Sequence, residues 1–415
     1  MLTAARLGAV ALTAAVLAGS AVPAFAATTS PAPIPTPAGL YGKGDPTYDG
    51  VWRQGLSLLA LHTQGVTPAA SAVDWLTGQQ CADGGWPSYN ADPTKPCAAA
   101  SEDTNATASA VQALVALGGH DAAVTKAVAW YRTVQNKDGG WSYNPGTPSD
   151  GNSTGLVVSA LLAAKTDPAT VAKNGKTGLD GLHSFQLGCT APAADQGAFA
   201  YQPDKKGKLV ANDAASAQAA LAAGSGFLPV AAATSSASAS AAGTASCSDP
   251  KAAASQYLAQ RLSTGGEHLT SQLAGAAPSP DYASTAWAAL ALVNGGRSAD
   301  AVKAVDWLRT NGEPWIQGNG ITAPAALALL VLDAKATGVD PHSFGTTDLV
   351  AQLEATGPAP AATPAPSASA SSSTSDSSSQ NTFSPWWLIL VGLAAGAGIG
   401  IYISYSRKHR SHPHA

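Results

Sequence analysis

The sequence contains few charged residues, and no basic stripe runs along it. Charged residues make up 12% of the 415 positions, and the formal net charge is −4. Proteins that bind nucleic acid gather Lys and Arg on one face to neutralise phosphates, so the composition excludes nucleic acid as a partner. Hydrophobic residues reach 45%, which is enough for a chain of this length to bury a substantial core.

Both ends of the chain have the composition of sorting segments. Residues 1–26 carry one Arg, an Ala/Leu/Val run and the small-residue ending AVPAFA, which predicts an export signal cut after Ala26. Residues 385–405 supply about 20 apolar residues with Trp and Tyr near both ends, which predicts a single transmembrane helix. The basic tail 406–415 then stays cytoplasmic, so we expect a membrane-anchored chain whose remainder faces outward.

Cysteine is scarce as well, and the four cysteines show neither CxxC spacing nor a neighbouring histidine cluster. This argues against a metal site. In an exported chain, four cysteines favour two disulfides. Cys81 and Cys97 flank one insert, and Cys189 and Cys247 flank another, so we expect these pairings, although four cysteines formally allow three connectivities.

Two stretches have the composition of unfolded spacers. Residues 27–40 are rich in Pro and residues 358–384 in Ser, Ala and Pro, which leaves too little apolar surface to pack. A third biased stretch, 231–246, lies inside the folded region and is expected to be a loop held by the second cysteine pair. The folded region is therefore 41–357.

Within residues 41–357, two kinds of helical segment alternate and together repeat about every 53 residues. The first kind is amphipathic and carries an aligned Trp at Trp75, Trp130 and Trp307, with Tyr257 marking a divergent copy. The second kind is Ala-rich and apolar on nearly every face, as expected of a buried helix. Six such pairs fit the length, so we predict an all-α array with the second kind inside.

Each segment of the second kind begins at a polar residue and reaches a Leu nine positions later. Five copies start at Asp49, Asn105, Asn152, Asn212 and Asp281. The sixth, Gly320 to Leu329, lacks the polar residue unless Asn319 replaces it. An open array needs a polar cap at each end, and neither end shows one, so closure into a ring is favoured.

Two short stretches share the pattern Gln-x-x-Asp-Gly-Gly-Trp, and a third, longer one varies it. The first has Gln80, Asp83 and Trp86, the second has Gln135, Asp138 and Trp141, and the third has Gln186, Asp195, Gly197 and Phe199 in the matching roles. They resemble the QW repeats of the squalene cyclase and prenyltransferase superfamily. The resemblance implies an α/α toroid of about six helix pairs, as does a more distant similarity to the intrinsic factor and transcobalamin toroid.

The residue types in this pattern suit a tight turn. A Gln at the end of an outer helix can bond backbone groups left free there, Gly-Gly permits a sharp reversal, and Trp can stack over the Gln amide. We therefore expect these residues to be structural.

None of the catalytic motifs of that superfamily occurs. The Asp-x-Asp-Asp, Asp-Asp-x-x-Asp and thioester Cys-Gly-Glu-Gln strings are absent, and the cysteines that a zinc site would need are expected in disulfides. Glu102 and Asp103 form the nearest pair of carboxylates and are expected to be solvated or to cap a helix. We predict no catalytic residue and no metal ligand, and an enzyme is disfavoured.

Equivalent inner helices should run in one direction, so that their N-termini converge on one mouth of the ring. The five polar residues Asp49, Asn105, Asn152, Asn212 and Asp281, the turn tyrosines Tyr89, Tyr143 and Tyr201, and Trp315 should gather there. Each Asn or Asp alone is explained as a helix N-cap. Aromatic rings beside converging polar groups, however, are typical of a site for a planar or amphipathic ligand.

Intrinsic factor and transcobalamin hold cobalamin at such a mouth with the help of a β-rich domain, and no such domain is recognisable in this chain. The resemblance implies a corrinoid as one candidate ligand and an uptake transporter as a partner. The sequence thus predicts a tethered, noncatalytic module that binds a small hydrophobic or corrinoid ligand. A terpenoid cyclase acting inside the ring and a purely structural surface protein remain alternatives.

Overall fold

The computed structural model describes residues 35–233, 246–271 and 277–361, and their regular structure is almost entirely helical. The predicted export signal, transmembrane helix and basic tail lie outside the described residues. Within the part of the chain that is described, no helix is both long and apolar enough to cross a membrane.

The described elements are helices of four to 18 residues and one short antiparallel hairpin. The first helix of each pair is α1 (Pro46–Thr63), α3 (Thr104–Leu117), α5 (Gly151–Ala163), α7 (Asp213–Ala223), α9 (Tyr282–Asn294) and α12 (Pro324–Thr337). The second helix of each pair is α2 (Ala70–Gly78), α4 (Asp121–Val134), α6 (Gly178–His183), α8 (Pro250–Thr264), α10 (Ser298–Asn311) and α13 (Leu349–Glu354). The remaining elements are α11 (Glu313–Ile316), the strands β1 (Ala172–Lys173) and β2 (Lys176–Thr177), and 3₁₀ turns of three residues each.

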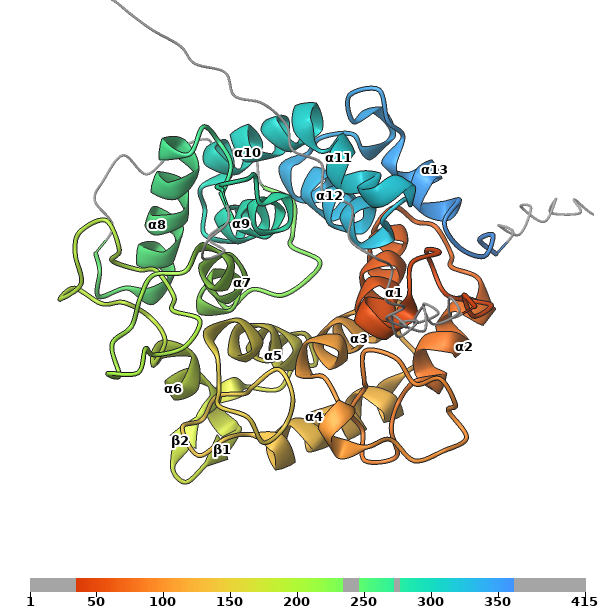
Figure 1. Ribbon diagram of the computed structural model, residues 1–415, viewed down its shortest axis with the longest axis horizontal. Helices are drawn as coiled ribbons and strands as arrows, with labels where there is room; N and C mark the ends of the chain where they lie inside the picture. The colour runs from red at the N-terminus through yellow and green to blue at the C-terminus, as the bar shows by residue number, and fades with distance from the viewer. Residues whose placement is uncertain (1–34, 234–245, 272–276, 362–415) are drawn as a thin grey trace, which may run out of the picture. The chain divides into compact units, whose positions relative to one another are not determined.

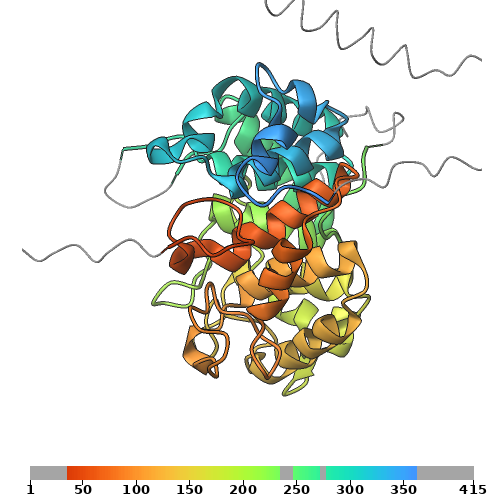
Figure 2. The ribbon, with the colours of Figure 1, turned by 90° about the vertical axis from the view of Figure 1, so that its right-hand side faces the viewer.

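The first helices of the six pairs form a closed inner ring. In chain order α1, α3, α5, α7, α9 and α12 each contact the next, and α12 returns to contact α1. Figure 1 looks down this ring, with the second helix of each pair on its outside. Figure 2, turned by a quarter, shows α1 lying between the last and the second pair. The predicted all-α array, its alternation and its closure are present in the described residues.

Small residues allow the inner helices to approach one another closely. A Cβ added at Gly55 of α1 would lie 2.3 Å from the Oγ of Ser109 on α3. A Cβ added at Gly155 of α5 would lie 2.7 Å from the Cα of Ala219 on α7. Larger side chains at these positions would push neighbouring helices apart, which explains why the inner segments are rich in Ala and Gly.

The three predicted Gln turns make the same contacts in three successive repeats. Nε2 of Gln80 donates to the carbonyl oxygens of Gly84 and of Ala123 in α4, and Nε2 of Gln135 donates to those of Gly139 and Val171. Nε2 of Gln186 donates to those of Gly197 and of Pro250 in α8. Each Gln thus ties its own turn to the outer layer of the next repeat, which is the structural role expected of it.

The glycines of these turns are required by their backbone and by close contacts. Gly84 and Gly139 have φ of 115° and 85°, and a Cβ on either would fall within 2.3 Å of a carbonyl oxygen of the next repeat. The indole Nε1 of Trp86 donates back to the carbonyl oxygen of Leu76, and that of Trp141 donates to Tyr131. The Trp of each turn therefore binds the end of its own outer helix.

Both expected disulfides form, Cys81–Cys97 across 16 positions and Cys189–Cys247 across 58. The first closes the insert that follows the first Gln turn. The second ties the stretched third turn to the segment before α8.

Residues 224–233, which follow α7, cross the end of the ring where the inner helices finish. The Oε1 of Gln112 on α3 accepts from the amide of Leu228, and the Oγ of Ser159 on α5 donates to the carbonyl oxygen of Gly226. The amide of Ala233 reaches the carbonyl oxygen of Ala336 at the end of α12. This segment, here called the plug, contacts inner helices on both sides of the ring and covers that end.

Candidate functional site

At the opposite end, where the inner helices begin, side chains from α1, α3, α5 and α7 surround a hollow of about 280 Å³. Four residues predicted for the mouth line it, namely Asp49, Asn105, Tyr143 and Asn152. They are joined by Tyr48, Trp52, Asp103, Ala106, Leu156 and Gln218. The hollow lies at the lower limit of typical small-molecule sites, which are roughly 300–1,000 Å³.

The amides of Asn105 and Asn152 meet across two neighbouring helices. Nδ2 of Asn105 donates to Oδ1 of Asn152 at 3.3 Å. Neither residue caps its helix, because Asp103 caps α3 through the amides of Asn105 and Ala106, and Asp150 caps α5. The interpretation of these two asparagines as N-caps was therefore wrong by two residues, and their side chains are available to the hollow.

Asp103 caps α3 and also fixes the wall of the hollow. Its Oδ1 accepts from the amides of Asn105 and Ala106 at 2.7 and 2.9 Å, and its Oδ2 accepts from the Oγ of Ser88 at 2.9 Å. Burial raises the pKa of Asp103, although hydrogen bonds from Ala106, Tyr143 and Ser88 oppose this. The hydroxyl of Tyr143 lies 3.4 Å from Ser88 Oγ, and burial beside Asp103 raises the tyrosine pKa. Tyr143 is thus held in place while the residue stays 41% exposed.

Asp49 stands where α1 kinks, with non-helical φ and ψ of −151° and 16°. Its carboxylate pairs with Arg53, whose guanidinium also donates to the carbonyl oxygens of Tyr41, Gly44 and Asp45. The charge of Asp49 is therefore largely compensated by Arg53.

The interior of the ring is filled near the floor of the hollow. Trp52 of α1 and Trp287 of α9, which are separated in the ring by α12, lie 6.1 Å apart between ring centroids. Gln218 of α7 reaches the hollow, and its Oε1 is buried without a hydrogen-bond partner among the described residues. A buried unpaired acceptor costs about 1–3 kcal/mol, so a donor that reached it would be favoured.

Three aromatic residues predicted for the mouth do not line this hollow. Tyr89 stacks on Trp75 of α2 with ring centroids 6.5 Å apart. Tyr201 is 48% exposed, and its carbonyl oxygen accepts from the amide of Gly151. Trp315 stacks on Tyr282 at 6.2 Å. Tyr89 therefore packs on the outer helix α2, whereas Tyr201 and Trp315 contact the first residues of α5 and α9.

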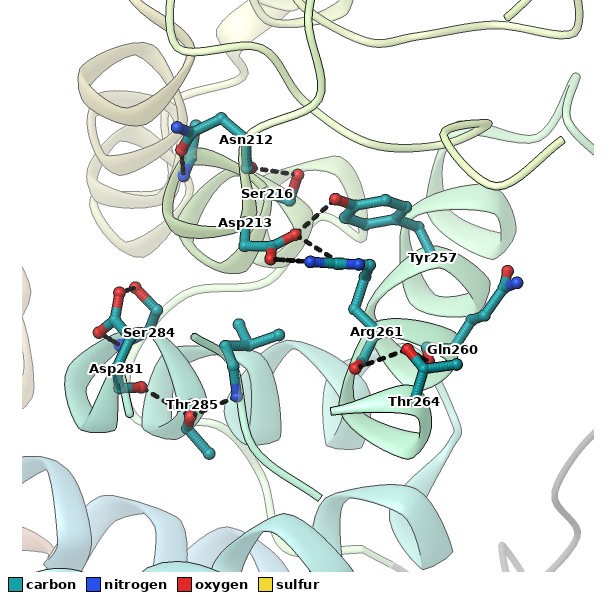
Figure 3. Close-up of polar contacts among 12 residues, drawn as sticks. Asn212, Asp213, Ser216, Tyr257, Gln260, Arg261, Thr264, Asp281, Ser284 and Thr285 are labelled. Atoms are coloured by element: carbon teal, nitrogen blue, oxygen red, sulfur yellow. Dashed lines mark hydrogen bonds and ion pairs between the residues drawn. The ribbon is translucent and has the colours of Figure 1, made fainter. Parts of the chain in front are cut away.

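The last two predicted residues, Asn212 and Asp281, are helix N-caps. Asn212 accepts from the amide of Ala215 at 2.8 Å, and Asp281 accepts from that of Ser284 at 2.9 Å. Figure 3 shows both caps. It also shows Tyr257 and Arg261 of α8 pointing at Asp213 on the first turn of α7, with Arg261 in a two-pronged ion pair. These contacts fasten an outer helix to an inner one and explain Asn212 and Asp281 without a ligand.

Glu102 is buried, being 2% exposed, so its expected placement in solvent was wrong. Its Oε2 accepts from Nε1 of Trp130 at 2.9 Å. Burial and a hydrogen bond shared with the carboxyl of Asp83 raise the pKa of Glu102 to about 7. Cys81 and Cys97 lie close enough to Glu102 to share a metal ion, but their sulfurs are joined in the disulfide.

One further carboxyl on an inner helix has no apparent structural use. Asp333 of α12 is fully buried, and neither of its carboxyl oxygens has a partner among the described residues. Burial raises the pKa of Asp333 well above its usual range, so the folded state favours the protonated carboxyl more than the unfolded chain does.

No protein-family description and no curated protein matches the chain. Among solved structures, the chain is similar to ent-copalyl diphosphate synthase from Streptomyces platensis, at 18% identity and a TM-score of 0.43, over 70% of this chain and 50% of that one. It is also similar to a protein from Actinoplanes, at 18% identity and a TM-score of 0.30, over 64% and 97% of the two chains. The chain thus spans about half the length of the synthase.

Proposed function

We propose that this protein is a membrane-anchored, extracytoplasmic binding module that holds a small ligand without transforming it. The observation that carries the proposal is the meeting of Asp49, Asn105, Tyr143 and Asn152 at one hollow. These residues come from three separate parts of the chain, and none of them is the N-cap of its helix. Aromatic rings beside amides that keep spare hydrogen-bonding capacity in a concave site are typical of ligand binding.

The plug supports the choice of this end of the ring. It covers the end where the inner helices finish, and the Trp52 and Trp287 rings fill part of the interior. A ligand would therefore enter at the side of the helix N-termini. The two disulfides fit the outward-facing location proposed for the ring.

A corrinoid presented to an uptake transporter is one form of this proposal. The hollow, at about 280 Å³, has room for one edge or substituent of so large a ligand. Most of a corrinoid would then rest on the rim, where Tyr48 is 80% exposed. A smaller ligand would fill the hollow more completely.

A terpenoid cyclase would need a strong acid supported by further polar groups in the ring. Asp333 lies on an inner helix, and both of its buried carboxyl oxygens lack a hydrogen-bond partner among the described residues. An acid of raised pKa is a weak proton donor, so Asp333 does not favour the enzyme.

The direct test is retention of a pigmented ligand by the full mature chain, purified in a zwitterionic detergent with its disulfides intact. Cobalamin and cobinamide are mixed with the protein and followed by absorbance on gel filtration. The binding module predicts co-elution that falls when Tyr143 or Asn152 is replaced by Ala and persists in Tyr201→Ala. Co-elution unaffected by any mouth substitution would place the site elsewhere, and absence of co-elution would remove the corrinoid form of the proposal.

A further inference from the structure

The lining of the hollow selects against charged ligands. Among the described residues, no Lys or Arg side chain lines it, so it offers no cation to an anionic ligand. Of its two carboxylates, Asp49 is paired with Arg53, and Asp103 accepts from two backbone amides and from Ser88. Little negative charge is left uncompensated to hold a cationic ligand.

What the hollow does offer is hydrogen bonding beside aromatic surface. Asn105 and Asn152 share one bond, which leaves the donor and acceptor capacity of their amides partly unused at the rim. Gln218 adds an amide at the floor, with an Oε1 that has no partner among the described residues. The aromatic side chains of Trp52 and Tyr143 line the same space.

We infer that the hollow binds a neutral polyhydroxylated ring of the size of one furanose or pyranose. This inference rests on the proposed binding function. Hydroxyl groups both donate and accept, which matches side-chain amides, while the C–H face of such a ring is apolar and packs on aromatic rings. A single sugar ring also fits a space of about 280 Å³. The ring can belong to a free sugar or to the head of a larger amphipathic molecule.

The test is ligand-observed saturation-transfer NMR on the full mature chain in a zwitterionic detergent. The probes are methyl glucoside, methyl galactoside, methyl mannoside and methyl riboside, with octyl glucoside for the amphipathic source. Binding of methyl glycosides would identify the free ring as sufficient. Binding of octyl glucoside alone would identify the sugar as the head of an amphipathic ligand. Tetramethylammonium and acetate are the charged probes, and preferential binding of either would overturn the inference.

Two substitutions and a matched control locate the site. Tyr143→Ala and Asn152→Ala should each weaken sugar binding about tenfold, because each removes one contact of the hollow. Tyr201→Ala is the control, since Tyr201 follows the third Gln turn, is similarly exposed, and does not line the hollow. Equal effects of Tyr143→Ala and Tyr201→Ala would contradict the assignment.

Gln218→Met keeps the site testable if the other variants fold poorly. It replaces an amide with a buried unpaired oxygen by a side chain of similar size, so the free protein should be at least as stable as before. Sugar binding should nevertheless fall, and unchanged binding would overturn the inference. If cobinamide is retained at the mouth but no sugar binds, the sugar inference fails and the binding function stands. If neither binds, the proposed function fails in this form as well.

Discussion

The indole of Trp130 on α4 donates a hydrogen bond across 2.9 Å to the carboxyl of Glu102, which lies just before α3. This carboxyl also shares a hydrogen bond with that of Asp83, and burial together with this bond raises the Glu102 pKa to about 7. In the second repeat, the Oγ of Ser149 donates to Asp138, the counterpart of Asp83. The protonated carboxyl of Glu102 therefore donates to Asp83 in the way that the hydroxyl of Ser149 donates to Asp138.

Glu102→Gln should make the stability of the ring less dependent on pH. In the native protein, the folded state keeps a proton on Glu102 between about pH 4.5 and 7, where the unfolded chain has released it, so stability falls as pH rises through this window. Gln imitates the protonated form at every pH. We expect similar thermal stability at pH 5 and a gain of ~1 kcal/mol, or about 2 °C in Tm, at pH 8.

Ser149→Ala is the control for this measurement, because it removes the equivalent bond to Asp138 without removing a titrating group. It should lower Tm by a similar amount at pH 5 and pH 8. A loss of stability in Glu102→Gln that grows with pH would contradict the assigned proton.

The ring and the disulfides could be predicted because they repeat or leave clear marks in the sequence. The Trp and the Gln each recur at the same place in three of the six pairs, and Cys81 and Cys97 bracket an obvious insert. The residues of the hollow are harder to predict from the sequence. Counting back from the Leu of each inner segment gave Asn105 and Asn152 as helix starts, yet Asp103 and Asp150 are the caps. Two polar residues two positions apart look equivalent in a repeat until the hydrogen bonds are known.

Other lining residues carry no signal in the sequence. Trp52 and Gln218 stand within helices that are apolar on nearly every face, and such residues are usually part of the core. The plug was missed as well, since residues 224–233 resemble any loop rich in Gly and Pro. Only its hydrogen bonds to α3 and α5, more than 60 residues away in the chain, place it across the end of the ring.

Asp333→Leu should stabilise the protein near neutral pH. Both carboxyl oxygens of Asp333 are buried without partners among the described residues, and burial raises the pKa well above its usual range. The folded state must therefore hold a proton that the unfolded chain releases above about pH 4. Leu has the same number of side-chain heavy atoms, branched at the same carbon, and no polar atoms to bury, so we expect a gain of about 1–3 kcal/mol at pH 7.

The gain from Asp333→Leu should shrink toward pH 4, where the unfolded chain also carries the proton. Denaturant unfolding at pH 4 and pH 7 measures this difference. A variant that is destabilised equally at both pH values would show that the carboxyl has partners or that Leu does not fit. Asp333→Asn separates these outcomes, because it keeps the shape and removes only the titration.

Removal of the Cys189–Cys247 disulfide should cost more stability than removal of Cys81–Cys97. The bridges span 58 and 16 positions, and the entropy of the unfolded chain rises with the length of the loop that is released. The chain-entropy relation gives losses of ~4 and ~3 kcal/mol for the paired Cys→Ala variants. Thermal unfolding of both variants measures the order. The reverse order would indicate that the short bridge also supports the first Gln turn and the buried Glu102.

Gln135→Ala should be among the most damaging substitutions that leave the core side chains intact. Gln135 is 1% exposed, and its Nε2 donates to the carbonyl oxygens of Gly139 and Val171 at 2.8 and 3.1 Å. Ala would leave both carbonyl oxygens without this donor, and the hydrogen bond that links the second Gln turn to Val171 of the third repeat would be lost. We expect a loss of about 2–3 kcal/mol, measured by urea unfolding.

Gln80→Ala is the matched comparison, since Gln80 makes the same pair of bonds but is only partly buried. Water can replace a donor there, so the loss should be about 1 kcal/mol. Gln135→Glu should be worse than Gln135→Ala, because a carboxylate would face two carbonyl oxygens and offers no donor unless it takes up a proton. A Gln135→Glu variant as stable as the native protein would show that the turn is held by its glycines and Trp141 rather than by the amide.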